Sequence, residues 1–368
     1  MKPFEYNDQE IGQKEVLFLV ANMVIGFGVL TLPRSIVEHT KSFDGWISIC
    51  IGGIIALFFT WVVAKLTMRF PKKNFYEISS AILNKYIGGI LTFLFATYSI
   101  LFVSYEMRGV ASISQLYLFD KTPVEVICLV FLLVVIYGIS GESIVILRIN
   151  LMFLPIVLFI VFVLMIMNLG YFELKNLKPF FISNWKEIAT ASKETVFSFL
   201  GFEFLLFYNA FINKPKNTSK SALMGISIPL VLYLTVFIFV IGVFGVDVTS
   251  NTLYPTAELA KQVEVPGGFF ERFESLFFTI WVMTLFSTAA MAFDITLLAL
   301  GAIMKKVKRM HFIFILSPII YLIAMSPQNI LEVASFGKVI SYTGIVFSMV
   351  IPSVLLTIAL IRGVKGDV

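Results

Sequence analysis

Long apolar stretches separated by short polar connections run along the whole chain. A membrane-spanning helix needs about 20 mostly apolar residues, and ten stretches have about this length or more. They lie at residues 14–38, 43–68, 87–118, 123–139, 144–168, 192–212, 222–246, 273–303, 311–325 and 338–361, the fourth and ninth being short. The pattern predicts an all-α polytopic membrane protein with ten transmembrane helices in a single transmembrane domain, residues 1–368.

Composition and charge support this class. Of the 368 residues, 58% are hydrophobic and 14% are charged, whereas about a quarter of a soluble protein is charged. Basic residues gather in the connections at 69–73, 213–220 and 305–311. Because cytoplasmic loops carry an excess of Lys and Arg, both termini are predicted to be cytoplasmic. The net charge of +5 therefore reflects topology and lipid contacts, and we expect no nucleic-acid partner.

The sequence offers little for catalysis or metal binding. Cys50 and Cys128 lie in separate apolar segments, and His39 and His311 are far apart. We expect no disulfide, no metal site and no cofactor. No nucleophile–base constellation or phosphate-binding loop is present, so the chain is not expected to be an enzyme.

Two connections are predicted to be external, at about 169–191 and 247–272. The second contains Pro255, which suits the first turn of a short helix, and Pro266, Gly267 and Gly268, which suit its end. We therefore expect a small helix in the external loop 247–272. The sequence leaves open whether it is a structural lid or takes part in gating.

The two halves of the chain resemble one another at an offset of five segments. Segments 3 and 8 are both long, and segments 5 and 10 both carry an interior proline, Pro155 and Pro352. Segments 1 and 6 are both interrupted by glycine, in "VIGFGVL" and "SFLGFEF". A repeat of five helices must run inverted in its second copy. We predict a first repeat at 14–168 and an inverted one at 192–361, a pattern that points to a transporter-like core with a midplane site.

The interruptions can bind a ligand. A broken helix leaves N–H groups free on one half and carbonyl groups free on the other, which together suit the charged ends of a zwitterion. Gly26, Gly28, Ser198 and Gly201 are small enough to let a ligand approach this backbone. The alternative is that these residues only allow close helix packing.

Three carboxylic acids lie inside apolar segments, where a charge is expensive. Glu203 follows the second interruption and is either a proton-titrating group or a carboxyl hydrogen-bonded to the loosened backbone. Glu106 shares a helix face with Tyr98, and is either a ligand contact or a partner of Arg108.

The third acid, Asp294, lies at a depth in segment 8 similar to that of Glu106 in segment 3. Thr288 lies beside its helix face. We expect Asp294 to pair with a basic residue towards the inner surface, for instance Arg148 or Lys305, and the sequence does not choose between them.

These motifs resemble those of a known superfamily. "GFGVLTLP" and "FSFLGFE" are similar to the first-helix and sixth-helix signatures of the amino acid–polyamine–organocation (APC) transporters, which have the LeuT-like fold. More narrowly, the chain resembles the B subunits of spore germinant receptors, the endospore germination permease family. "SFLGFEFLLFYNAFIN" and "LYPTAELAKQVEVPGGFFERFESLFFTIW" carry this narrower resemblance.

The resemblance implies a subunit of the spore inner membrane that binds a small germinant and signals to an A-type membrane subunit and a C-type lipoprotein. It places the ligand pocket between segments 1, 3, 6 and 8, and on this chain the matching positions are Gly26, Gly28, Tyr98, Ser198, Gly201 and Thr288. Phe199, Leu200 and Phe347 are candidates to close a passage beside the pocket, or else ordinary packing residues.

Three functions stay open from the sequence. The first is a nutrient sensor for a compact amino acid such as Ala or Val, since the predicted pocket lining is small and largely apolar. The second is an amino acid permease, proton-coupled through Glu203. The third is a water or ion passage that the ligand opens.

Overall fold

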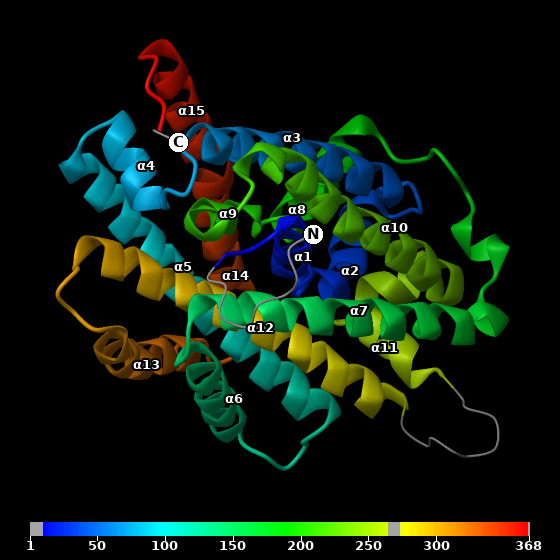
Figure 1. The fold of residues 1–368 in the computed structure, drawn as a ribbon. Coiled ribbons are helices and arrows are strands. Elements are labelled where there is room, and N and C mark those ends of the chain that lie inside the picture. The colour runs from blue at the N-terminus through cyan, green and yellow to red at the C-terminus, as the bar shows by residue number, and fades with distance from the viewer. Residues whose placement is uncertain (1–9, 264–272, 367–368) are drawn as a thin grey trace.

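The computed structural model describes residues 10–263 and 273–366, and these residues form helices and connections without a β-strand (Figure 1). The helices are α1 (Gln13–Val24), α2 (Gly28–Thr40), α3 (Gly45–Arg69), α4 (Phe75–Ile82), α5 (Lys85–Tyr117), α6 (Val124–Ile139), α7 (Ser143–Met167), α8 (Trp185–Ser198), α9 (Leu205–Tyr208), α10 (Thr218–Asn251), α11 (Pro255–Lys261), α12 (Phe273–Ile303), α13 (Arg309–Met325), α14 (Ile330–Ile345) and α15 (Ile351–Ile361). Short 3-10 turns include η2 (Leu174–Leu177), η3 (Phe202–Phe204) and η4 (Asn209–Phe211), and a π-helical turn, η6 (Val346–Val350), joins α14 to α15.

The helices identify an integral membrane protein. Among the described residues, six helical stretches are long and apolar enough to cross a membrane, and α1 with α2, bent by 50°, passes the same test as a pair. The other three predicted segments are α6 and α13, which are shorter apolar helices, and α8 with α9, which are interrupted. Each of the ten predicted segments thus corresponds to one helix or to an interrupted run of helices.

Two helices, α8 and α14, begin several residues before the apolar segments that predicted them. α8 begins at Trp185 and α14 at Ile330, seven and eight residues before the expected starts at 192 and 338. The charged residues Lys186, Glu187 and Glu332 in the first turns interrupt the apolar pattern, although the two glutamates suit a helix N-terminus. The short helix α4 also has no counterpart in the prediction, because it is too short to show a spanning pattern.

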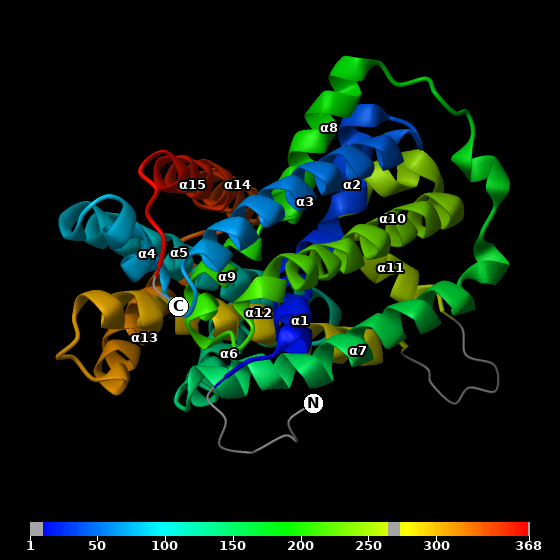
Figure 2. The same cartoon turned by 45° about the horizontal axis from the view of Figure 1, so that its top comes forward.

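The first helix lies at the centre of the bundle. Both views place α1 among α7, α10 and α12, which it contacts (Figure 2). Beside it, α5 and α12 run antiparallel over most of their length, since Ser99 Oγ donates to the Ala292 carbonyl at 2.9 Å and Tyr117 stacks on Phe278 with ring centroids 4.4 Å apart. Two long helices packed in this way fix the position of the side chains between them.

The connection between α7 and α8, which the sequence predicts to be external, is attached to the connection between α2 and α3. Asp44, just before α3, accepts hydrogen bonds from the backbone N–H groups of Phe181, Ile182 and Ser183 at 2.6, 2.7 and 2.9 Å. Burial raises the pKa of Asp44, but these hydrogen bonds outweigh it and hold the pKa below its ordinary value. The attachment therefore contributes stability above the unfolded-state pKa and loses it only as the pH falls through the lowered one.

The second connection that the sequence predicts to be external contains α11 (Pro255–Lys261). Thr256 Oγ1 donates to the Val29 carbonyl at 2.7 Å, and Glu258 accepts from Tyr117 at 2.8 Å. The helix therefore packs over the outer ends of α2 and α5. The stop expected at Pro266, Gly267 and Gly268 lies outside the described residues.

Candidate functional site

The first interruption separates α1 from α2. Val24 ends one helix and Gly28 begins the next, with the 50° bend between them. Leu30 N–H donates to the Phe27 carbonyl, whereas the N–H groups of Gly28 and Val29 open α2 and have no acceptor within it. The predicted break in the first span therefore presents backbone donors.

The second interruption follows α8. Gly201 has φ = +126°, a value that side-chain-bearing residues rarely adopt, and only the short turns η3, α9 and η4 continue the span. The Gly201 N–H donates to Oε2 of Glu203 at 2.8 Å. Glu203 thus satisfies a backbone donor that the break leaves free.

The two interruptions touch one another. A methyl group added at Gly201 would lie 2.6 Å from the carbonyl oxygen of Met23, and one added at Gly28 would lie 3.0 Å from Cβ of Ser198. The Tyr233 hydroxyl, from α10, lies 2.7 Å from the Val24 carbonyl and 3.1 Å from the Ser198 carbonyl. Gly28 and Gly201 therefore provide the close approach of the two broken spans, and Tyr233 connects them.

A carboxyl group from α5 lies beside the first break. Glu106 is 2% exposed, and its Oε2 accepts a hydrogen bond from Thr288 Oγ1 on α12 at 3.2 Å. Its Oε1 faces Gly26, where an added methyl group would lie 3.4 Å away. Within residues 10–263 and 273–366, no group donates a hydrogen bond to Oε1, and no ion pair joins Glu106 to Arg108. Gly26, Glu106 and Thr288 therefore form one site.

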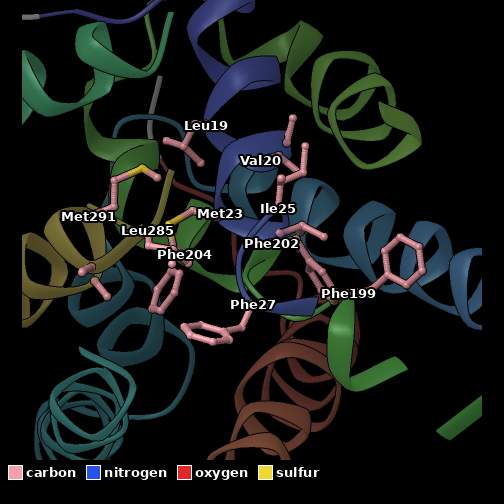
Figure 3. Close-up of a cluster of buried hydrophobic side chains, with 14 of the residues drawn as sticks. Leu19, Val20, Met23, Ile25, Phe27, Phe199, Phe202, Phe204, Leu285 and Met291 are labelled. Atoms are coloured by element: carbon pink, nitrogen blue, oxygen red, sulfur yellow. The ribbon is translucent and has the colours of Figure 1, made fainter. Parts of the chain in front are cut away.

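Apolar and aromatic side chains surround this site. The Phe27 ring occupies the space that a side chain at Gly109 would take, and its centroid is 5.9 Å from that of Tyr105. Figure 3 shows Phe27, Phe204 and Leu285 among the apolar side chains around the break. The break beside Glu106 is therefore lined mainly by apolar and aromatic side chains.

Two of the three candidate passage residues, Leu200 and Phe347, lie with the pocket candidate Tyr98 next to Glu203. The Tyr98 hydroxyl donates to Oε1 of Glu203 at 2.8 Å, and its ring stacks on Phe347 with centroids 5.5 Å apart. A methyl group added at Gly344 would lie 2.7 Å from Leu200 and 3.0 Å from the Tyr98 hydroxyl. Tyr98, Leu200 and Phe347 thus form a closed aromatic–aliphatic contact between spans 3, 6 and 10.

Phe199 lies apart from this contact. Its ring packs on Tyr233 with centroids 5.1 Å apart, and it is fully buried. Adjacent residues of the break thus face different helices, with Phe199 towards α10 and Leu200 towards α14.

Asp294 belongs to a separate network near the start of α13, away from the two breaks. Its carboxylate pairs with Arg309 at 2.5 Å and accepts hydrogen bonds from Ser143 at 2.8 Å and Tyr208 at 3.0 Å. Its partner is therefore Arg309, from the first turn of α13, rather than Arg148 or Lys305. The network connects α7, α9, α12 and α13.

The burial of this ion pair is asymmetric, which leads to a prediction. Asp294 is fully buried, whereas the Arg309 side chain is 27% exposed. Arg309→Met leaves a buried, unpaired carboxylate and is expected to cost about 3–5 kcal/mol of stability. Asp294→Asn leaves an arginine that still reaches water and the Ile139 carbonyl, so its cost should be smaller.

Thermal unfolding of the purified variants in detergent measures this difference. The double variant should be more stable than Arg309→Met alone, because the unpaired carboxylate is then absent. Equal and additive losses from the two single variants would contradict a buried ion pair at this position.

The sequence analysis missed several polar contacts in the core. Asn22, just before the first break, donates to Asn150 on α7 at 2.9 Å, and Asn150 contacts Met291 on α12 at 2.9 Å. Two lone asparagines in apolar segments were a signal for this contact, since an unpaired amide is costly there. Tyr233 and the π-helical turn at Phe347 gave no comparable signal. Across the described residues, no group of three or more His, Cys, Asp or Glu side chains could hold a metal ion.

Comparison with known sequences identifies relatives over the full chain. The family model described as spore germination protein matches residues 10–333. Spore germination protein GerLB of Bacillus cereus is 37% identical, with 100% of this chain and 98% of the relative covered. Spore germination protein YndE of Bacillus subtilis (strain 168) is 33% identical over 95% of this chain and 96% of the relative.

Comparison with solved structures identifies the fold. MhsT in complex with L-phenylalanine superposes with a TM-score of 0.69 at 14% identity, covering 95% of this chain and 89% of MhsT. Mhp1, a nucleobase-cation-symport-1 family transporter in a closed conformation, gives 0.64 at 14% identity, covering 94% and 79%. The chain therefore has the LeuT-like fold that its sequence predicts.

Proposed function

The chain belongs to the spore germination permease family, and from that premise we propose that it is the nutrient-sensing subunit of a spore germinant receptor. It binds a compact amino acid between the two broken spans and signals to an A-type membrane subunit and a C-type lipoprotein. It acts in the spore inner membrane with both termini cytoplasmic, as a receptor rather than an enzyme. Relatives named for spore germination support this assignment.

The position of Glu106 carries the proposal. Its Oε1 faces the small residue Gly26 and has no protein donor among the described residues, so a ligand ammonium can occupy that side. The ligand carboxylate then accepts hydrogen bonds from the free N–H groups of Gly28 and Val29 at the start of α2. The two charged ends of an amino acid thus find opposite charges on either side of one break.

The lining favours a small apolar side chain. Phe27 already fills the space beside Gly109, and Phe204 and Leu285 are apolar neighbours (Figure 3). A sugar would leave its hydroxyl groups without partners there. MhsT, which has the same fold, is described in complex with an amino acid, L-phenylalanine.

Signalling follows from the contact between the two breaks. A ligand held by α2 and Glu106 changes the relative stability of conformations in which the broken spans are close or apart. Met23 and Gly201 make that contact directly. The partner subunits then respond to the conformation and need not touch the ligand.

One observation favours a proton-coupled permease as the second candidate. Glu203 is fully buried and contacts both the break and Tyr98, a place from which its protonation would alter both spans. The closed contact of Tyr98, Leu200 and Phe347 is equally where a water or ion passage would open.

Binding and uptake by the purified protein in proteoliposomes test the proposal. A panel of radiolabelled amino acids is first measured for binding, and the best ligand is then measured for uptake at several proton gradients. The sensor predicts saturable binding without uptake. Saturable, gradient-dependent uptake that Glu203→Gln abolishes would instead establish the permease.

A further inference from the structure

A cavity of about 440 Å³ opens on the external side of the molecule, away from the broken spans. It lies between the connection from α2 to α3, the η2 turn and the outer part of α10. Its volume is within the usual range for small-ligand sites, about 300–1,000 Å³. Nothing in the proposed function uses it.

The cavity carries charges of both signs. Lys41, Lys175, Lys178 and Asp247 line it. Lys175 pairs with Glu173 at 2.7 Å, whereas the other three have no side-chain hydrogen bond or ion pair within the described ranges. Two free ammonium groups and one free carboxylate therefore share a space large enough for a ligand.

The backbone around the cavity is unusual at two of its lining residues. Lys41 has φ = +49° and Gly245 has φ = +73°. The left-handed conformation costs a residue with a side chain about 1–2 kcal/mol, and Gly or Asn is usual where a helix ends in this way. Lysine at position 41 is thus a costly choice for the backbone, and it places an ammonium group in the cavity wall. Gly245 interrupts α10 beside the same wall.

Apolar side chains next to the cavity mark the level of the membrane surface. Phe181 and Ile182, on the connection that also supplies Lys178, are 76% and 58% exposed, and Trp185, the first residue of α8, is 77% exposed. Val248, at the cavity, is 52% exposed. Exposed aromatic residues at the outer ends of spans are typical of the lipid headgroup region. The cavity therefore lies where a headgroup can enter it.

We infer that this cavity binds a phosphoethanolamine group, as a phospholipid headgroup or as the free compound. The phosphate lies between Lys41 and Lys178, and the primary ammonium pairs with Asp247. The bound group connects the outer end of α2 to α10, so it stabilises the arrangement of the outer half of the first broken span.

The test compares the melting temperature of the purified protein in nanodiscs of three compositions. Phosphatidylethanolamine added to phosphatidylcholine should raise Tm. Phosphatidylglycerol, which has no ammonium group, should raise it less, and phosphatidylcholine alone offers Asp247 no N–H donor. Free phosphoethanolamine added to phosphatidylcholine nanodiscs shows whether the headgroup suffices or the acyl chains are needed, and a rise in either arm supports the inference.

Variants separate this site from a general effect of the bilayer. Lys41→Asn with Lys178→Gln should abolish the phosphatidylethanolamine-dependent rise, and asparagine tolerates the left-handed backbone. Lys220→Gln, which removes one positive charge from the other end of α10 and so matches Lys178→Gln, should keep the full rise. Asp247→Asn should make phosphatidylglycerol as effective as phosphatidylethanolamine. Should the double variant fail to fold, Lys178→Gln alone, on an exposed connection, must still reduce the rise.

Two results would overturn the inference. One is a rise that is equal in the lysine variants and in Lys220→Gln, which would assign it to the bilayer. The other is a protein with its native residues that responds equally to phosphatidylglycerol and phosphatidylethanolamine, which would remove the role of Asp247.

Discussion

Replacing Glu106 by glutamine is expected to weaken amino acid binding at least about thirtyfold. The substitution keeps the shape of the side chain but removes the negative charge that faces Gly26. Losing one partner of a buried charged hydrogen-bonded pair costs about 2–5 kcal/mol, and each 1.4 kcal/mol is tenfold in affinity. Binding of the radiolabelled amino acid to purified protein measures the loss directly.

The matched control is Thr288→Val, which removes the hydrogen bond to Oε2 but leaves the charge. Its effect should be smaller, because a single hydrogen bond to a charged group contributes about 1.5–3 kcal/mol. Gly26→Leu should abolish binding by filling the space beside Oε1. If Glu106→Gln bound the amino acid as well as the native protein does, the ammonium site would lie elsewhere.

Replacing Gly201 by alanine is expected to destabilise the protein by about 2–6 kcal/mol. The new methyl group would lie 2.6 Å from the Met23 carbonyl oxygen, which is backbone and cannot rotate away. The residue would also hold φ = +126°. Backbone strain of this kind costs about 1–3 kcal/mol, and overpacking adds a similar amount. Thermal unfolding and the yield of monodisperse protein both report the loss.

Two other glycines serve as controls for that substitution. A methyl group at Gly170 would meet no atom within 4 Å, so Gly170→Ala should leave Tm unchanged. One at Gly26 would meet only Glu106 at an ordinary contact distance, so Gly26→Ala should fold and affect mainly ligand binding. A native Tm for Gly201→Ala would show that the two breaks are not in tight contact.

The sequence predicted the features that follow directly from how one residue type behaves in a membrane. Apolar length defined the spans, and glycine in the middle of spans 1 and 6 located the breaks. The carboxyl groups of Glu106 and Glu203 were singled out by their cost in the bilayer, and both are buried beside a break. The boundaries of the two inverted repeats stay a prediction.

The sequence could not predict which side chains pair between helices, because such pairs depend on how each helix is rotated about its axis and how deep it lies in the membrane. Asp294 pairs with Arg309, and the sequence could not single out Arg309 because it lies among several basic residues of the connection at 305–311. Phe199 and Leu200 are adjacent, yet they face α10 and α14, since the chain is not helical at the break. Periodicity assigns a face only to residues inside a regular helix.

The Tyr233 hydroxyl has a single proton, and two carbonyl oxygens compete for it, one at the end of α1 and one at the end of α8. While the spans are together, each oxygen has part of a hydrogen bond. When one span withdraws, the proton goes wholly to the other, so the enthalpy lost is a fraction of a bond rather than a whole one. Separating the broken spans therefore costs less free energy than breaking two separate hydrogen bonds would. A ligand as small as an amino acid then needs less binding energy to shift the conformation.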